Sequence, residues 1–190
     1  MELIQEAWFY TLGLVCAYLL GSVPVGDLVC RALGVDIRNR GTGNPGAANI
    51  FREVGLIASV VVFALDLSKG AVAIMPFYLF ELPTWITLIA MVSVLGGHIF
   101  PVFWRFRGGT GLVVGMGTTI AMLPFGFLFA VPITVLAVKV TKNITYLAAL
   151  FFFLTIVSGA IFHEDLVRVV SVLLAASIIW VKSRIQYRDK

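Results

Sequence analysis

The chain has 190 residues, of which 60% are hydrophobic and only 13% are charged. Soluble domains carry about 25% charged residues, so the composition excludes an ordinary soluble protein and predicts an integral membrane protein. Long apolar runs, without the short alternating segments of a β-barrel, favour an all-α helical bundle. We expect one domain, residues 1–190, and attribute the net charge of +4 to membrane topology, not to nucleic-acid binding.

Six apolar runs follow one another along the chain: 8–30, 54–80, 85–104, 111–138, 144–162 and 166–181. The first run follows an acidic segment that lacks the basic region of a signal peptide, so we expect it to be retained as a membrane span. The run 111–138 would form a helix of ~42 Å, longer than the ~30 Å hydrocarbon core. Leu123-Pro124-Phe125-Gly126 lies at its centre and predicts a turn. Dividing the run there gives about seven transmembrane helices.

The distribution of Lys and Arg residues tests this number of spans. With seven spans and the N-terminus outside, 12 of the 14 Lys and Arg residues lie on the cytoplasmic side: Arg31, Arg38, Arg40, Arg52, Arg105, Arg107, Lys139, Lys142, Lys182, Arg184, Arg188 and Lys190. A six-span arrangement would divide these residues equally between the two sides. The positive-inside rule therefore favours a polytopic protein with seven spans, an outer N-terminus and a cytoplasmic C-terminus.

A polar, glycine-rich segment, residues 34–52, forms the first predicted cytoplasmic loop. Its glycines permit turns that point several free backbone N–H groups at one anion, and its arginines add forked donors that match phosphate. Amides and a hydroxyl in the same loop can orient a carbonyl or hydroxyl group. These residues are Arg38, Arg40, Gly41, Thr42, Gly43, Asn44, Gly46 and Asn49. The plain alternative is a surface turn whose basic residues follow the positive-inside rule.

A second glycine-rich segment, residues 97–111, ends with Arg105-Phe-Arg-Gly-Gly-Thr-Gly111 just before an apolar run. This order predicts a helix N-terminus, which presents unpaired N–H groups and a partial positive charge to an anion. The segment lacks the full Walker pattern, so it implies no nucleotide. Close helix packing is the alternative reading of its small residues, and it suits Gly111, Gly115 and Gly117 better than Gly108 and Gly109.

Four ionisable residues fall within or beside the predicted spans. Asp66 and Lys69 are three residues apart on one helix face and predict an ion pair, of functional or purely structural importance. Asp27 is placed to orient Arg38 or Arg52. His98 is a candidate base, a candidate donor to phosphate, or a hydrogen-bonded core histidine.

Together these residues resemble the bacterial acyl-phosphate:glycerol-3-phosphate acyltransferases, the PlsY family. The similarity extends over about residues 17–117. The segments that carry it are Gly21-Ser22, Gly26, Asp36-Ile-Arg38-Asn39, Gly43-Asn44-x-Gly46-Ala47-x-Asn49, Asp66-x-x-Lys69-Gly70, Gly97-His98-x-x-Pro101-Val102-Phe103 and Gly108-Gly109-x-Gly111.

The resemblance implies transfer of a fatty acyl group from acyl-phosphate to glycerol 3-phosphate, giving 1-acyl-glycerol 3-phosphate (lysophosphatidic acid) in phospholipid biosynthesis. It implies no metal or other cofactor, and a place among the lipids of the bacterial cytoplasmic (inner) membrane. It also implies transient contact with the soluble enzyme that forms acyl-phosphate. Because both substrates carry phosphate, the protein has to hold two anions together and stabilise a developing oxyanion.

These considerations give one set of expected site residues. We expect catalytic roles for Arg38, Thr42, Asn44 and His98. We expect substrate binding by Gly43, Gly46, Asn49, Arg52, Lys69, Arg107, Gly108, Gly109, Gly111 and Lys182.

The chain also departs from the family pattern. Thr110 stands where the family usually has a lysine, Thr42 where it has a serine, and Ala48 where it has a threonine. Residues 180–190 show no counterpart of the histidine and asparagine in a third family motif, His-Arg-Glu-Asn-Ile. The alternative function is therefore a non-catalytic or altered-substrate paralogue that binds a phospholipid or organophosphate. A small transporter is disfavoured, because the sequence shows no internal repeat.

Overall fold

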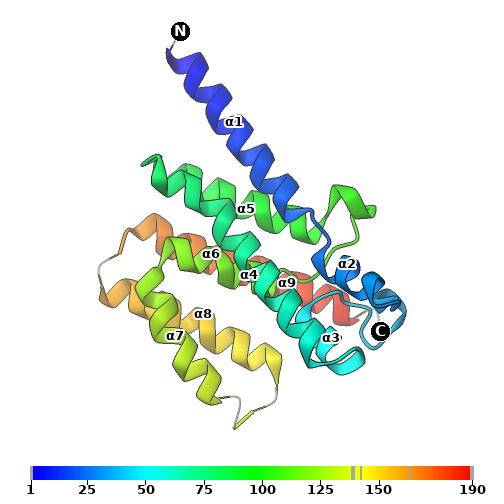
Figure 1. The fold of residues 1–190 in the computed structure, drawn as a ribbon. Coiled ribbons are helices and arrows are strands. Elements are labelled where there is room, and N and C mark those ends of the chain that lie inside the picture. The colour runs from blue at the N-terminus through cyan, green and yellow to red at the C-terminus, as the bar shows by residue number, and fades with distance from the viewer. Residues whose placement is uncertain (1, 138–139, 142, 163, 189–190) are drawn as a thin grey trace.

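The computed structural model describes residues 2–137, 140–141, 143–162 and 164–188, and the regular elements of this part of the chain are all helices (Figure 1). The α-helices are α1 (Glu2–Gly21), α2 (Val25–Ala32), α3 (Ala47–Glu53), α4 (Leu56–Leu79), α5 (Thr84–Ile99), α6 (Leu112–Met122), α7 (Pro124–Ala137), α8 (Ile144–Ile161) and α9 (Leu166–Arg188). Two 3-10 turns, η1 (Ile37–Asn39) and η2 (Val102–Trp104), lie in the loops.

Four helical segments are long and apolar enough to cross a membrane: Ala7–Ala32, Leu56–Leu79, Thr84–Trp104 and Leu166–Gln186. Three shorter apolar helices accompany them: Leu112–Met122, Pro124–Ala137 and Tyr146–Ile161. The all-α membrane fold predicted from composition is confirmed at this level.

Proline positions explain two helix boundaries. The predicted turn within 111–138 is confirmed, because α6 ends at Met122 and α7 begins at Pro124. The run 8–30 lies within one apolar segment long enough to cross a membrane, Ala7–Ala32, but its helix is interrupted: α1 ends at Gly21 and α2 begins at Val25, directly after Pro24. Proline has no N–H to donate and disfavours helical backbone in the residue before it, so the helix is interrupted there. The first predicted loop contains the short helix α3.

Small residues let the helices that carry the site cross at close range. A Cβ atom on Gly117 of α6 would collide with the carbonyl oxygen of Leu67 on α4, and one on Gly97 of α5 would collide with that of Tyr18 on α1. In lipid, where helix association depends on close packing, such contacts are a main source of stability. They join α6 to α4 and α5 to α1, and α4 also packs against α5.

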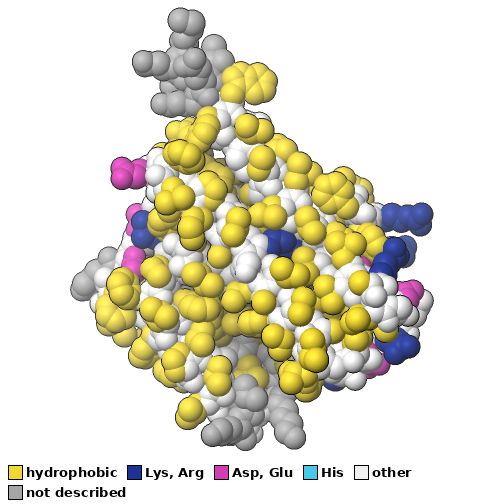
Figure 2. All heavy atoms as spheres, in the orientation of Figure 1, with side chains coloured by type: hydrophobic (Ala, Val, Ile, Leu, Met, Phe, Trp, Pro, Cys, Tyr) yellow, Lys and Arg dark blue, Asp and Glu magenta, His cyan; other side chains and the backbone are white. Residues whose placement is uncertain are grey.

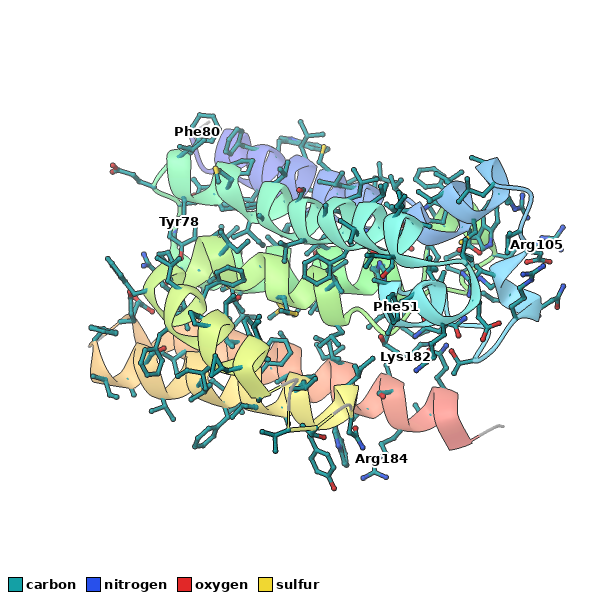
Figure 3. The ribbon with its side chains drawn as sticks, turned by 60° about the horizontal axis from the view of Figure 1, so that its bottom comes forward. Phe51, Tyr78, Phe80, Arg105, Lys182 and Arg184 are labelled. Atoms are coloured by element: carbon teal, nitrogen blue, oxygen red, sulfur yellow. The ribbon has the colours of Figure 1, made fainter. Side chains whose placement is uncertain are left out.

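The outside of the bundle is apolar and its charges are unevenly placed. Hydrophobic side chains cover most of the face seen in Figure 2, and several Lys and Arg side chains gather at its right edge. In Figure 3, Arg105, Lys182 and Arg184 lie at one end of the bundle, and Tyr78 and Phe80 lie at the other. We call the end that carries these three cations the cationic end. The side chains of Lys139, Lys142, Arg188 and Lys190 lie outside the described residues.

Candidate active site

Arg38 fastens the first loop to the second. Its Nε and Nη2 atoms donate to the two carboxylate oxygens of Asp27, both at 2.7 Å, and Asp27 is buried. Nη2 also donates to the carbonyl oxygen of Arg107 at 2.7 Å, and Nη1 lies 3.5 Å from that of Gly108. A bidentate carboxylate pair fixes the plane of the guanidinium. The suggestion that Asp27 orients Arg38 is therefore confirmed, and Nη1, whose bond to the Gly108 carbonyl is long, has a second proton for a ligand.

The amides of the first loop hold the loop itself together. Asn49 accepts a hydrogen bond from the Thr42 N–H at 3.0 Å and donates one to the carbonyl oxygen of Arg40 at 3.1 Å. Asn44 accepts from the Gly46 N–H at 3.1 Å. The Gly43 N–H donates to the Arg40 carbonyl at 2.8 Å, and its positive φ of 64° suits glycine. These groups shape the loop through internal bonds.

The second loop folds back on the end of α5. The Gly108 and Gly109 N–H groups donate to the carbonyl oxygens of Ile99 and His98, at 3.1 and 3.3 Å. A Cβ on Gly108 would collide with the His98 carbonyl, and one on Gly109 would lie 2.6 Å from His98 Nε2. Only glycine permits this approach, which brings the loop backbone against the imidazole.

These bonds correct one expectation of the sequence analysis. The backbone N–H groups of Thr42, Gly43, Gly46, Gly108 and Gly109 were expected to point freely at an anion, but each has a partner within the protein. Backbone N–H groups that lose their contact with water when the loops fold need hydrogen-bond acceptors, and the nearest acceptors are within the same two segments.

The N-terminus of α6 offers donors of another kind. Gly111 has the left-handed φ of 85° at the N-cap, and no side chain caps the helix. The first intrahelical donor is the Gly115 N–H, to the Gly111 carbonyl, so the preceding turn presents its N–H groups outward. The prediction that segment 105–111 opens a helix is confirmed. A helix N-terminus of this kind attracts an anion.

A buried cluster joins α4 to α5. Lys69 Nζ lies 3.0 Å from Asp66 Oδ1, 3.1 Å from His98 Nδ1 and 3.1 Å from the carbonyl oxygen of Val23. The predicted Asp66–Lys69 ion pair is confirmed, and both side chains are almost fully buried. Val23 belongs to the interruption between α1 and α2, and its carbonyl oxygen also accepts from the Val25 N–H at 3.0 Å.

One cavity of about 900 Å³ connects the polar loops with the membrane helices. Its polar part is lined by Thr42, Gly46, Arg52, Asp66, His98, Thr110 and Gly111. Its apolar part, between α8 and α9, is lined by residues that include Ala148, Ala149, Phe152, Phe153, Ile156, Leu173, Ala176 and Ile179. We call this apolar part the groove. The cavity therefore has the form needed for a molecule with an anionic head and a long apolar tail.

The predicted residues take different positions around this cavity. Five line it: Thr42, Gly46, Arg52, His98 and Gly111. Thr42 Oγ1 is buried and has no hydrogen-bond partner among the described residues. Arg38, Gly108, Gly109 and His98 also border a small neighbouring cavity. Asn44 lies against Gly109, and Lys182 packs over the ring of Phe100 at 5.4 Å. Gly43, Asn49 and Lys69 have internal partners, and the Arg107 side chain is exposed.

Sequence reasoning missed the small groove residues of α8 and α9, Ala148, Ala149, Ala176 and Ser177. They lie in continuously apolar runs, where the sequence does not distinguish a lipid-facing position from a groove-facing one. Within the described residues, no three His, Cys, Asp or Glu side chains come together as metal ligands would.

Comparison with known proteins adds an independent line of evidence. A family model described as "Glycerol-3-phosphate acyltransferase" matches residues 11–188. The chain belongs to the glycerol-3-phosphate acyltransferase family. It is 38% identical over 174 residues to the "Glycerol-3-phosphate acyltransferase" of Geobacillus kaustophilus, covering 90% of this chain and 87% of the relative. The protein of the same name from Bacillus velezensis is 35% identical over 168 residues, covering 88% and 86%.

A solved structure has the same fold as this family member. The crystal structure of PlsY (YgiH), an integral membrane glycerol 3-phosphate acyltransferase, in its glycerol 3-phosphate form, superimposes with a TM-score of 0.86. The two chains are 25% identical, and the match covers 94% of this chain and 90% of that one. The resemblance inferred from the two loops is thus confirmed. The chain is an enzyme of this acyltransferase family and a multi-pass membrane protein.

Proposed function

We propose that the chain transfers a fatty acyl group from acyl-phosphate to glycerol 3-phosphate and releases lysophosphatidic acid, at the start of phospholipid synthesis. The observation that carries the proposal is the large cavity, whose lining changes from polar, with Arg52, to apolar. An acyl-phosphate has the same division between its phosphate and its chain. Membership of the family supports the acceptor and the product.

The reaction needs few groups from the protein. The glycerol hydroxyl oxygen bonds to the acyl carbonyl carbon, and the bond from that carbon to the phosphate oxygen breaks. The hydroxyl proton ends on the released inorganic phosphate, so atoms and charge balance without a cofactor. Because acyl-phosphate is already activated, the protein contributes positioning and stabilisation of the developing oxyanion.

Each part of the site has a role in this scheme. The acyl chain occupies the groove, and its phosphate lies near the α6 N-terminus, Thr42 and Arg52. Glycerol 3-phosphate enters from the cationic end, where Arg38 and Lys182 attract it. Lys182 is close enough to Arg38 for their charges to interact, and it forms no ion pair with a carboxylate among the described side chains. Two neighbouring cations of this kind favour a bound anion.

We also propose a topology and a location. The four long helical segments and the three shorter helices form seven spans, with the N-terminus outside and the C-terminus in the cytoplasm of a bacterial cell. The gathering of Arg105, Lys182 and Arg184 at one end in Figure 3 supports this orientation. The substrate-filled site then opens toward the cytoplasm. Transient contact with the soluble acyl-phosphate-forming enzyme stays a prediction from the family resemblance.

The test is an assay of purified protein in lipid nanodiscs with palmitoyl-phosphate and labelled glycerol 3-phosphate. We expect labelled lysophosphatidic acid, lost in Arg38→Ala and retained in Arg40→Ala. Arg40 is a matched control because it is exposed in the same loop, and the contacts that it makes to Asn49 and Gly43 use only its backbone carbonyl.

Other outcomes would replace the proposal. Binding of both substrates by well-folded protein without product would favour the non-catalytic or altered-substrate paralogue. Product from palmitoyl-CoA but not from palmitoyl-phosphate would show that the donor is wrong.

A further inference from the structure

The buried cluster of Asp66, Lys69 and His98 determines which ring nitrogen of His98 carries a proton. Three acceptors surround the Lys69 Nζ atom within 3.1 Å: Asp66 Oδ1, the Val23 carbonyl and His98 Nδ1. A lysine ammonium has three protons and no lone pair. It can therefore only donate at its 3.1 Å contact with the ring, so the imidazole Nδ1 has to accept a proton there.

This geometry fixes the charge state as well as the tautomer. A proton on Nδ1 would point at the Lys69 ammonium, so that two hydrogen-bond donors would face each other at 3.1 Å. Asp66 Oδ1 is 3.0 Å from Lys69 but 3.9 Å from His98 Nδ1, so the carboxylate pairs with the lysine and leaves the ring neutral. A neutral ring that accepts through Nδ1 carries its proton on Nε2.

The protonated Nε2 faces the reaction site. A Cβ on Gly109 would lie 2.6 Å from Nε2, so this edge of the ring is turned toward the second loop. His98 lines the polar part of the large cavity and also borders the small cavity beside Arg38. It is thus the residue that lies between the proposed positions of the two substrates.

We propose that His98 acts as an Nε2–H hydrogen-bond donor to the reacting acyl-phosphate oxygens, not as the general base, and that Lys69 and Asp66 are positioning residues that hold this tautomer. The inference rests on the proposed acyl transfer. It also gives a role to Lys69, which is buried between Asp66, the Val23 carbonyl and His98. Donation toward the carbonyl oxygen stabilises the negative charge that develops there as the hydroxyl adds.

The tautomer is measurable without any turnover. The chain has two histidines, so ¹⁵N-histidine labelling in a His163→Asn background leaves one imidazole, whose ring ¹⁵N chemical shifts distinguish the two tautomers and the doubly protonated ring. We expect the Nε2–H form at neutral pH. Asp66→Asn/Lys69→Met, which removes both charges together, should abolish the preference. Lys182→Met also removes a charge that interacts with His98 but no hydrogen bond to the ring, so it should leave the tautomer unchanged.

The activities of two His98 variants distinguish a hydrogen-bond donor from a general base. Glutamine at position 98 keeps an N–H donor but is no base, whereas alanine has neither. We expect His98→Ala to lower kcat about 100-fold, as loss of one oxyanion donor does, and His98→Gln to be at least about tenfold more active than His98→Ala. Equal losses in both variants would overturn the donor role.

The NMR experiment can also overturn the proposal independently. An Nδ1–H or doubly protonated ring, or an Nε2–H signal unchanged by Asp66→Asn/Lys69→Met, would do so whether or not the enzyme is active. Absence of wild-type activity together with the expected tautomer would instead count against the proposed function.

Discussion

Asp27→Asn tests whether the orientation of Arg38 matters for catalysis. The substitution keeps the size of the side chain but removes its charge, and it turns an amide N–H₂ toward one of the guanidinium N–H groups. Arg38 then loses at least one of its two 2.7 Å bonds to Asp27. A hydrogen bond to a charged group contributes about 1.5–3 kcal/mol. The Arg38 side chain is 25% exposed, so solvent replaces only part of the loss.

If that free energy is needed to hold Arg38 in its productive position, kcat/KM for glycerol 3-phosphate falls about 10- to 150-fold. The assay is acyl transfer in nanodiscs at saturating palmitoyl-phosphate, with size-exclusion chromatography to confirm folding. Asp36→Asn is the matched control, because Asp36 is an exposed carboxylate that caps η1 and asparagine caps equally well. A change below twofold in Asp27→Asn, or equal losses in both variants, would refute the reasoning.

Three further substitutions test packing, the groove and the polar end of the cavity. Gly117→Ala should destabilise the bundle by about 1–3 kcal/mol, because the new Cβ collides with the α4 backbone. Gly96→Ala is the control, because a Cβ there has no atom within 4 Å. Thermal unfolding in detergent compares the two variants. Ala176→Phe puts a larger side chain into the groove and should lower activity with palmitoyl-phosphate about tenfold relative to octanoyl-phosphate, since each methylene that is no longer buried costs about 0.8 kcal/mol. The control is Ala160→Phe at an exposed position, which should keep the wild-type ratio of the two activities. Thr42→Val should lower kcat/KM about tenfold without loss of stability, because Thr42 Oγ1 has no partner among the described residues, while Thr42→Ser should stay active.

Most helix boundaries could be predicted from the sequence because prolines and polar loops mark them. The turn at Pro124 follows from the excessive length of the run and the missing N–H. The interruption at Pro24 obeys the same rule, but it lies within a run of ordinary span length, so length gave no reason to divide it. The number of helices with membrane character is therefore predictable, whereas short breaks within a span are less so.

The chemical character of the site could also be predicted from the sequence, but its hydrogen-bond partners could not. The glycine-rich loops indicated an anion, and their residues do surround one cavity. Residue spacing carries no information on which donors are already used, so Asn49 and Lys69 could not be distinguished from residues with free groups. Their partners, the Arg40 carbonyl and the Val23 carbonyl, are backbone atoms that no side-chain pattern reveals.

The site lies where helices end, and the membrane gives a physical reason for this. Within a bundle surrounded by lipid, every backbone group of a continuous helix is satisfied, so unpaired groups arise only at breaks and termini. The Val23 carbonyl at the break accepts from Lys69 as well as from the Val25 N–H, and the start of α6 supplies N–H groups to the cavity. The end of α5 supplies carbonyls that seat Gly108 and Gly109 against His98. The same interruptions that limit the spans thus create the polar chemistry of the site.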